Sequence, residues 1–455
     1  MAEPTLKQRV WGWAFFDWAQ QPYATLGLTF IFSPYFAAVA TQYFMSLGAD
    51  AASAKVEAQG LWSTAQTFAG LFIAFTAPFL GAFADMTGRK RPWFWALATI
   101  AVVCAASLWG LQPDGTGLIF ALAAFWIGFV ASESAFNLNN AILPDLGDTE
   151  DVGRISGNAA AFGYWGGVLS LFIMLLFFAE NDTGKTLIGL SPAFGLDPEA
   201  REGTRFVGPF IAIWFAIFLI PFFKWTVDKP DTSSSKVTFG RVLADLRANI
   251  RAVGQQRSTR NFLLASLFYR DALSALYAYG GVYATLVLGW SIIQIGVFGI
   301  IAAIAAALLT WAGGIADQRL GPKPVIRSAI VLLVIVCSFI VGMSRDSLFG
   351  IPLPEGSALP DIIFYVCGAV IGGMGGALYS ASRSLMVRHA DPARSGEAFG
   401  LFALAGRATA WLAPALIALF TYLTQSNQLA FLPVIGLFII GLILLRWVNP
   451  LGEQV

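Results

Sequence analysis

The amino-acid sequence predicts an all-α integral membrane protein in which twelve transmembrane helices form two pseudo-symmetric bundles of six. Of its 455 residues, 57% are hydrophobic and only 12% are charged, whereas soluble domains carry about 25% charged residues. Its apolar stretches are long enough to cross a bilayer, which takes about 20 residues per helix. Two short motifs occur once in each half of the chain, as expected of a duplicated helix bundle.

The predicted spans follow from the apolar stretches in chain order. They are residues 11–44, 59–83, 92–112, 117–143, 157–179, 206–227, 260–288, 292–315, 324–344, 359–382, 397–422 and 429–448. The first span is longer than one crossing and contains Pro22 and Pro34. Because proline removes a helix hydrogen bond, we expect this span to bend, with Pro22 the favoured position.

A polar connector divides the chain into an N-terminal bundle (residues 1–227), a linker (228–259) and a C-terminal bundle (260–455). Apolar residues recur in the linker at helical spacing from Phe239 to Val253, and arginines lie mostly off that stripe. The pattern predicts an amphipathic cytoplasmic helix on the membrane surface. A plain helical linker is the alternative interpretation.

Positive charge predicts the orientation of the chain. Lysine and arginine concentrate in the loops on the side of both termini, so both termini should be cytoplasmic. The apolar stretch that follows Lys7 and Arg9 is longer than the roughly 7–15-residue core of a signal peptide, so we expect it to remain as the first span.

The composition excludes several classes of function. The net charge of +1 gives no basic excess for nucleic acid. The three cysteines are far apart and there is one histidine, His389, so the sequence predicts no metal site and no disulfide framework. Neither a phosphate-binding Walker loop nor a catalytic set is present, so we expect no enzyme and no cofactor.

The first repeated motif is an acidic-then-basic loop between two spans. It reads GAFADMTGRKR at residues 81–91 and GGIADQRLGPK at residues 313–323. A second pair, RISG at 154–157 and RSG at 394–396, precedes an FG dipeptide in each half. The second copy of the first motif has one more residue between its aspartate and the following glycine.

Together, these features resemble the major facilitator superfamily over essentially the whole chain. Finer motifs resemble its vacuole-effluxer-like branch, whose eukaryotic members are autophagy-related amino-acid exporters. They are FFDWA (15–19), PYAT (22–25), TFIFSPYF (29–36), YRD (269–271), GGVYA (280–284), SRSL (382–385), GEAFGLF (396–402) and Pro414. Gln20, Gln21 and Arg270 depart from the branch pattern, where smaller polar or neutral residues are usual.

The resemblance implies a secondary active transporter that works by alternating access and exports a small polar solute of amino-acid type. It also implies that helices one, four, seven and ten line a central cavity. Short loops without the eukaryotic insertions indicate a bacterial plasma-membrane protein, which we expect to be a monomer. Its partners would be a small-molecule substrate and the lipid bilayer.

Charged side chains within spans are costly, about 2.5–3.5 kcal/mol each on insertion scales, so those that remain need a partner or a task. Asp17 shares a helix face with Gln20 and Gln21. It is interpreted as a substrate or gate residue, or alternatively as a helix cap. Glu133 begins a second polar stripe and is the candidate for proton transfer or for binding a substrate amine, with a packing role as the alternative. The stripe continues through Asn137 and Asn140.

The C-terminal half supplies the remaining cavity candidates. Arg270 could bind a substrate carboxylate bidentately and could face Glu133 or Asp17, whereas Asp271 points in another direction. Arg407 lies near the middle of the eleventh span and is either cavity-lining or an inter-helix clamp. The candidate set is completed by three tyrosines, Tyr23, Tyr269 and Tyr277.

The repeated motifs are predicted to form a cytoplasmic gate. By the superfamily pattern, Asp85 should lie at a helix N-terminus near Gly396, and Asp317 at another near Ser156, where the helix dipole favours an anion. The remaining gate candidates are Gly81, Gly88, Arg89, Arg91, Arg154, Gly313, Arg319 and Arg394.

The sequence thus predicts a proton-coupled transporter of a small polar solute, with protons as the coupling ion. One alternative is a transporter of a larger amphiphile, such as a lipid, drug or peptidoglycan fragment, because the first helix is rich in tryptophan. Another is a non-transporting membrane assembly factor on the same fold. The retained intramembrane charges and the paired aspartate loops favour a protein that moves.

Overall fold

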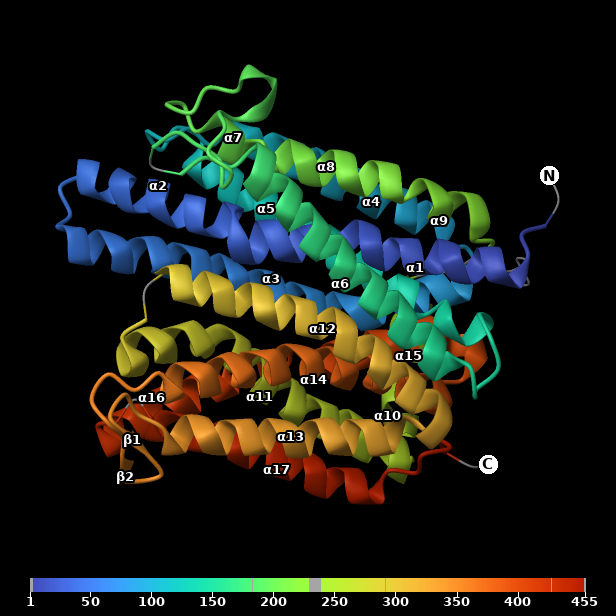
Figure 1. Cartoon of the computed structure of the whole chain (residues 1–455). Coiled ribbons are helices and arrows are strands. Elements are labelled where there is room, and N and C mark those ends of the chain that lie inside the picture. The colour runs from blue at the N-terminus through green and yellow to red at the C-terminus, as the bar shows by residue number, and fades with distance from the viewer. Residues whose placement is uncertain (1–2, 182, 229–238, 291, 427, 454–455) are drawn as a thin grey trace. The chain divides into compact units, whose positions relative to one another are not determined.

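The computed structural model describes residues 3–181, 183–228, 239–290, 292–426 and 428–453. Within them, ten helical segments are long and apolar enough to cross a membrane. Two further elements occupy the places of the seventh and eleventh predicted spans: α11 (Arg257–Leu288), and the pair α15 (Ser395–Ala405) and α16 (Leu412–Thr424). The chain has the predicted all-α fold of a twelve-span membrane protein (Figure 1).

The chain forms two compact units whose boundaries cut across helices. Unit 1 comprises residues 1–75, 87–139 and 162–234, and unit 2 comprises residues 76–86, 140–161 and 235–455. Two segments of the N-terminal half, 76–86 and 140–161, therefore group with the C-terminal half. The predicted division at residues 228–259 stays a prediction, and residues 229–238 of that linker lie outside the described residues.

Unit 1 is built mainly from the first six predicted spans. Its elements are α1 (Leu6–Pro22), η1 (Tyr23–Phe30), α2 (Phe32–Ser46), most of α3 (Ala51–Thr87), α4 (Arg91–Ser107), η2 (Leu108–Gly110), α5 (Leu118–Asn140), the C-terminal part of α6 (Val152–Phe177), η4 (Ala193–Gly195), α7 (Glu202–Arg205), α8 (Val207–Phe218) and α9 (Ile220–Trp225). Aromatic rings fill its core. The ring of Phe16, for example, contacts those of Phe94, Phe215 and Phe222.

The first span stops being a regular α-helix at Pro22, the position at which the sequence predicts a bend, whereas its non-helical residue is Ile31, with φ of −125° and ψ of −61°. Helix α1 ends at Pro22, and the chain continues as the π-helical segment η1 before α2 begins at Phe32. Proline cannot donate the regular helix hydrogen bond, and wider π-type turns commonly absorb such an interruption. The change from α-helix to π-helix thus comes directly after the polar residues Gln20 and Gln21.

Unit 2 contains the remaining spans. Its elements are η3 (Leu143–Asp145), α10 (Phe239–Gln255), α11, α12 (Ile292–Leu320), α13 (Pro322–Gly342), the strands β1 (Ser347–Leu348) and β2 (Ile351–Pro352), α14 (Leu359–His389), η5 (Pro392–Arg394), α15, α16, η6 (Leu429–Phe431), α17 (Leu432–Leu444) and η7 (Leu445–Trp447). Helices α13, α14 and α17 lie close together (Figure 1).

Glycines allow α14 to approach α12 closely. A β-carbon on Gly372 would collide with the backbone of Ala302, and one on Gly368 would collide with the ring of Phe298. Small residues on one stripe are a common device for close helix packing in membranes.

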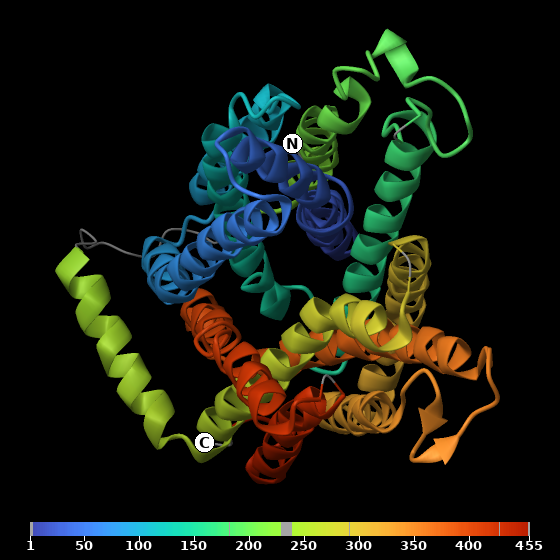
Figure 2. The ribbon, with the colours of Figure 1, turned by 90° about the vertical axis from the view of Figure 1, so that its left-hand side faces the viewer.

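Helix α10 occupies the linker region in which an amphipathic helix is predicted. Val242 and Leu246 are buried, whereas Arg241, Arg247 and Arg251 are exposed. Figure 2 shows α10 in yellow-green, joined to α11 at its C-terminal end. Its placement on a membrane surface stays a prediction.

The eleventh predicted span, 397–422, is not one helix. Residues 406–411 form turns between α15 and α16. Pro414 lies in the first turn of α16, where its missing N–H costs nothing. In one continuous helix from α15, its ring would clash with the carbonyl four residues earlier. Hydropathy predicts only that such a stretch crosses the membrane, so this break was not foreseen.

Candidate functional site

The two predicted polar stripes of the N-terminal half meet in unit 1. The side-chain amide of Gln20 donates a hydrogen bond of 2.9 Å to Oε1 of Glu133. Gln20 is buried, at 4% exposure, and Glu133 is half-buried. A carboxylate on α5 and an amide near the C-terminal end of α1 therefore form one polar site inside an apolar helix bundle.

Asp17 lies one turn before this pair and is also buried. Nδ2 of Asn139 lies 3.5 Å from Oδ1 of Asp17 and donates to the carbonyl of Trp13 at 3.4 Å. The indole of Trp13 returns a hydrogen bond of 2.7 Å to the carbonyl of Asn139. Asn139 thus joins α5 to α1, although the sequence analysis singled out its neighbours Asn137 and Asn140 instead.

The other unit 1 candidates have different surroundings. Gln21 packs on α6, where a β-carbon on Gly167 would lie 2.8 Å from its Cγ atom. Tyr23 is buried at 1% exposure, and its hydroxyl donates to the carbonyl of Ala101 at 3.4 Å, away from Glu133. Asn137 is half-buried on α5.

In unit 2, Arg270 and Asp271 bind the two helix ends that flank the break in the eleventh span: the C-terminal end of α15 and the N-terminal end of α16. Nη1 of Arg270 donates to the carbonyl of Phe402 in α15 at 2.8 Å. Oδ2 of Asp271 accepts from the backbone N–H of Ala413 in α16 at 3.1 Å. Arg407 lies between the two helices, in the break itself. The predicted approach of Arg270 to Glu133 or Asp17 stays a prediction.

Tyr269 and Tyr277 connect α11 to α14. The hydroxyl of Tyr269, which is fully buried, lies 2.8 Å from Oγ of Ser382. Tyr277 is 53% exposed, and its hydroxyl lies so close to Gly375 that any side chain there would displace it.

The first repeated motif meets the second within unit 2. A β-carbon on Gly81 would collide with the carbonyl of Gly396, and Oδ2 of Asp85 accepts from the N–H of Glu397 at 2.9 Å. That N–H belongs to the first turn of α15, where a carboxylate is favoured by free N–H groups and by the helix dipole. Gly88 follows with a φ of +64°, which suits the turn into α4.

The second copy makes a related contact with α6. Gly314 and Gly157 touch so closely that neither could carry a side chain without a shift, and Gly313 packs on Ala377. Asp317 is 1% exposed and lies against Gly153 in the first turn of α6. Its extra residue is absorbed before Gly321, whose φ of +85° parallels that of Gly88.

A buried arginine that the sequence analysis did not select joins this region. Arg383 of α14 is fully buried; its Nε atom donates to Oγ of Ser156 at 2.9 Å and Nη2 donates to the Ser156 carbonyl at 2.7 Å. Nη1 donates to Oδ1 of Asn140 at 3.0 Å, and Oγ of Ser156 donates to the Ser380 carbonyl at 2.9 Å. We call Asn140, Ser156, Ser380 and Arg383 the latch. The SRSL motif contained the signal, but the tenth predicted span ends at residue 382 and therefore leaves Arg383 outside the membrane.

The predicted basic gate residues have varied surroundings. Arg91 donates to the carbonyl of Phe223 at 2.7 Å within unit 1. Arg154 pairs with Asp151 at 3.0 Å, and Arg394 lies 3.9 Å from Glu397; both arginines are exposed. The Arg154–Asp151 pair is exposed on both sides, and exposed pairs of this kind contribute little to stability. Arg89 and Arg319 are exposed as well.

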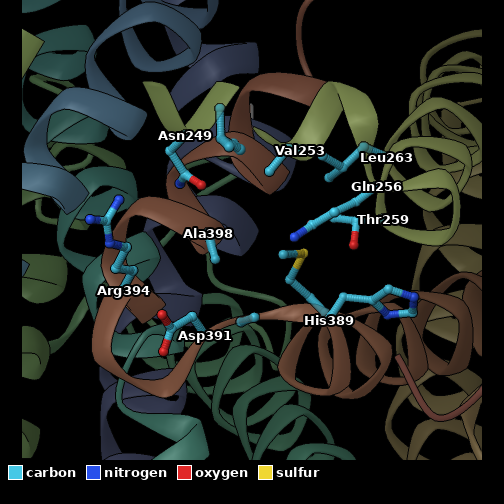
Figure 3. A pocket seen from close by; sticks show the side chains of 12 residues that line it. Asn249, Val253, Gln256, Thr259, Leu263, His389, Asp391, Arg394 and Ala398 are labelled. Atoms are coloured by element: carbon cyan, nitrogen blue, oxygen red, sulfur yellow. The ribbon is translucent and has the colours of Figure 1, made fainter. Parts of the chain in front are cut away.

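Unit 2 also contains a cavity of ≈ 210 Å³. Figure 3 shows its lining side chains, which come from α10, the beginning of α11, the end of α14, and α15. Arg394 is its one member among the predicted site residues. Figure 3 also labels several polar lining residues, namely Asn249, Gln256, Thr259, His389 and Asp391.

A multi-pass helical chain that carries buried polar sites, and in which two copies of one loop motif each meet a helix N-terminus, has the features of a membrane transporter built on a duplicated helix bundle. Solved structures share this fold. The human organic anion transporter MFSD10 (TETRAN) matches with a TM-score of 0.69 at 17% identity, over 97% of this chain and 100% of that one. The proton:xylose symporter XylE matches with a TM-score of 0.67 at 12% identity, over 99% and 96%.

Sequence comparison is more specific. An MFS-type transporter of Bacillus subtilis (strain 168), YxiO, described as uncharacterized, is 22% identical over 437 residues, which cover 96% of this chain and 94% of the relative. Residues 5–451 match the family described as vacuole effluxer Atg22 like. The chain belongs to this family of major facilitator transporters, as its motifs indicated, and it is a secondary transporter rather than an enzyme.

Proposed function

We propose that this protein exports a small polar solute of amino-acid type from a bacterial cell by alternating access, in exchange for protons. The observation that carries the proposal is the hydrogen bond between Gln20 and Glu133. A titratable carboxylate that accepts a hydrogen bond from a neutral amide within an apolar bundle can change charge as its access to the two sides of the membrane changes. Export is supported by the family description, vacuole effluxer, and the amino-acid type of the solute is inferred from the resemblance of the motifs to the exporters of this branch.

The gate in this proposal consists of the two aspartate loops and the latch. Asp85 caps α15, Asp317 lies against α6, and Arg383 ties the segment 140–161 to α14. These contacts join parts of the chain that are far apart in sequence, so they can form and break as one set. Positive charge in the adjoining loops supports a cytoplasmic location for the gate and for both termini.

The aromatic first helix, which motivated the alternative of a larger amphiphile, serves packing in unit 1. Trp13 and Tyr23 are buried, and Trp18 stacks on Phe162 at 4.4 Å. These rings support the bundle and leave amides and carboxylates as the polar groups near the bend. The arrangement favours a polar solute.

The test is transport in proteoliposomes. A thermal-shift screen of the purified protein against amino acids first selects a solute, because a bound ligand raises the melting temperature. Glu133→Gln should then abolish uptake driven by a pH gradient while solute exchange persists. Glu150→Gln, the same chemical change at an exposed loop residue, should behave as wild type. Wild-type gradient-driven rates in Glu133→Gln would refute the proposed coupling site.

A further inference from the structure

The interruption of the eleventh span is a built feature of unit 2. Helix α15 ends at Ala405 and α16 begins at Leu412, so each presents unsatisfied backbone groups inside a membrane protein. Such groups are tolerated at membrane depth only where protein or a water-filled cavity satisfies them. Hydrogen bonds within the turns satisfy some of them, such as that from Gly406 N–H to the Phe402 carbonyl at 3.1 Å, and two adjacent residues of α11 add further partners.

Arg270 holds the C-terminal end of α15. Its guanidinium donates to the Phe402 carbonyl at 2.8 Å and lies 4.5 Å from the centre of the Phe402 ring. A β-carbon on Gly406 would collide with this guanidinium, so the glycine leaves room for it. A cation at a helix C-terminus is favoured by the helix dipole.

Asp271 holds the N-terminal end of α16 with the opposite charge. Its Oδ2 atom accepts from Ala413 N–H at 3.1 Å, and the residue is only 3% exposed. The other oxygen, Oδ1, is buried, and no hydrogen-bond partner for it occurs in the described part of the chain. A desolvated carboxylate oxygen without a partner is costly, so this carboxylate has the capacity to bind one more positive group.

We propose that the break between α15 and α16 is a binding site for a small monovalent cation, a proton or a sodium ion, which binds Oδ1 of Asp271. Half-helix ends and unwound backbone next to a carboxylate are the groups that hold such ions in other membrane transporters. That the cation is the coupling ion rests on the proposed function; the site itself does not.

Cation binding and capping compete for the same carboxylate. The N-terminus of α16 favours an ionised Asp271, so a cation on Oδ1 weakens the bond to Ala413 N–H. Because the break is where the span can bend, occupancy of the site would change the angle between α15 and α16. A local charge change is thereby converted into movement of a whole helix.

The elements that pack around α11 carry other charged and titratable groups. Asp271 makes no ion pair with any of them among the described residues. They include Arg270 on α11 itself, Arg407 in the break, Glu397 on α15, Tyr422 on α16, and Tyr379 and Arg383 on α14. Helix α17 carries none.

The experiment is thermal unfolding of the purified full-length protein in detergent. Melting temperature is measured in sodium chloride and in an equal concentration of choline chloride at fixed pH, and then across mildly acidic to mildly alkaline buffers in choline chloride. The variants are Asp271→Asn, which keeps an acceptor for Ala413 N–H, and Asp271→Glu, which keeps the charge. Asp346→Asn is the matched control at an exposed loop position.

A higher melting temperature in sodium than in choline would identify sodium, whereas a response to pH alone would identify the proton. In either case the response should be lost in Asp271→Asn and kept in Asp271→Glu and Asp346→Asn. A wild-type response in Asp271→Asn, or no response in the wild type, would overturn the proposal. If the melting-temperature response were lost only in Glu133→Gln, the proposed site at Asp271 would be overturned and the proposed function would stand. If the protein did not transport the solute, the proposed function would be refuted and the proposed site would stand.

Discussion

Replacing Arg383 with methionine tests whether the latch holds the gate closed. Methionine keeps much of the side-chain length but removes the guanidinium that binds Ser156 and Asn140 in three hydrogen bonds of 2.7–3.0 Å. Hydrogen bonds with a charged partner contribute about 1.5–3 kcal/mol each. Desolvation of the arginine offsets part of this gain, as it does for buried ion pairs.

We expect a net loss of about 3 kcal/mol from the closed arrangement, within the range measured when one partner of a buried charged contact is removed. Since 1.4 kcal/mol corresponds to a factor of ten in an equilibrium constant, the ratio of open to closed gate should rise about 100-fold. Ser156 keeps its own hydrogen bond to the Ser380 carbonyl, so part of the latch survives in the variant.

The assay is the rate at which a maleimide modifies a single reporter cysteine. The three native cysteines are replaced by alanine, and Ser384→Cys, a nearly isosteric change at a residue of 0% exposure, supplies the reporter. When opening is fast relative to modification, the labelling rate follows the open population. Arg257→Met, at an exposed arginine, is the matched control.

Labelling in Arg383→Met should increase by one to two orders of magnitude, and labelling in Arg257→Met should not change. Equal labelling in the two variants, with both proteins monodisperse and folded, would show that the buried arginine stabilises α14 without controlling access. In that case the gate would depend on the aspartate loops alone.

Two further predictions concern packing and capping. Gly372→Ala should lower the melting temperature, at a cost of about 1–3 kcal/mol, because its methyl group meets the Ala302 backbone, whereas Gly436→Ala, which faces open space, should not. At the start of α3, hydrogen bonds led by the Ser53 hydroxyl hold the pKa of Asp50 below its usual 3.8. This cap stabilises the helix above the unfolded-state pKa and is lost as pH falls through the lower folded value. Protection factors of the amides in the first turn of α3, which are exchange rates corrected for the intrinsic effect of pH, should therefore fall on acidification in the wild type and stay unchanged in Asp50→Asn; the same acid-induced fall in the variant would contradict the assignment.

The amino-acid sequence by itself determined the class of protein, most of the spans, the end of the regular α-helix at Pro22 and the two aspartate loops. Each of these features depends on a local property: hydropathy over about 20 residues, the missing N–H of one proline, or a short motif. The resemblance to the superfamily, and not the sequence pattern alone, indicated which helix termini the aspartates would face: one near Gly396 for Asp85 and one near Ser156 for Asp317.

Only the tertiary structure decided which distant groups meet. Arg270 and Asp271 are neighbours in sequence yet bind the two ends of a broken helix more than a hundred residues later, and Arg383 reads as a loop charge until Asn140 and Ser156 are placed around it. A hydropathy profile treats the eleventh stretch as continuous because it sums apolar character without regard to backbone hydrogen bonding. Whether a buried charge is tolerated depends on partners brought from other helices, and no local pattern specifies them.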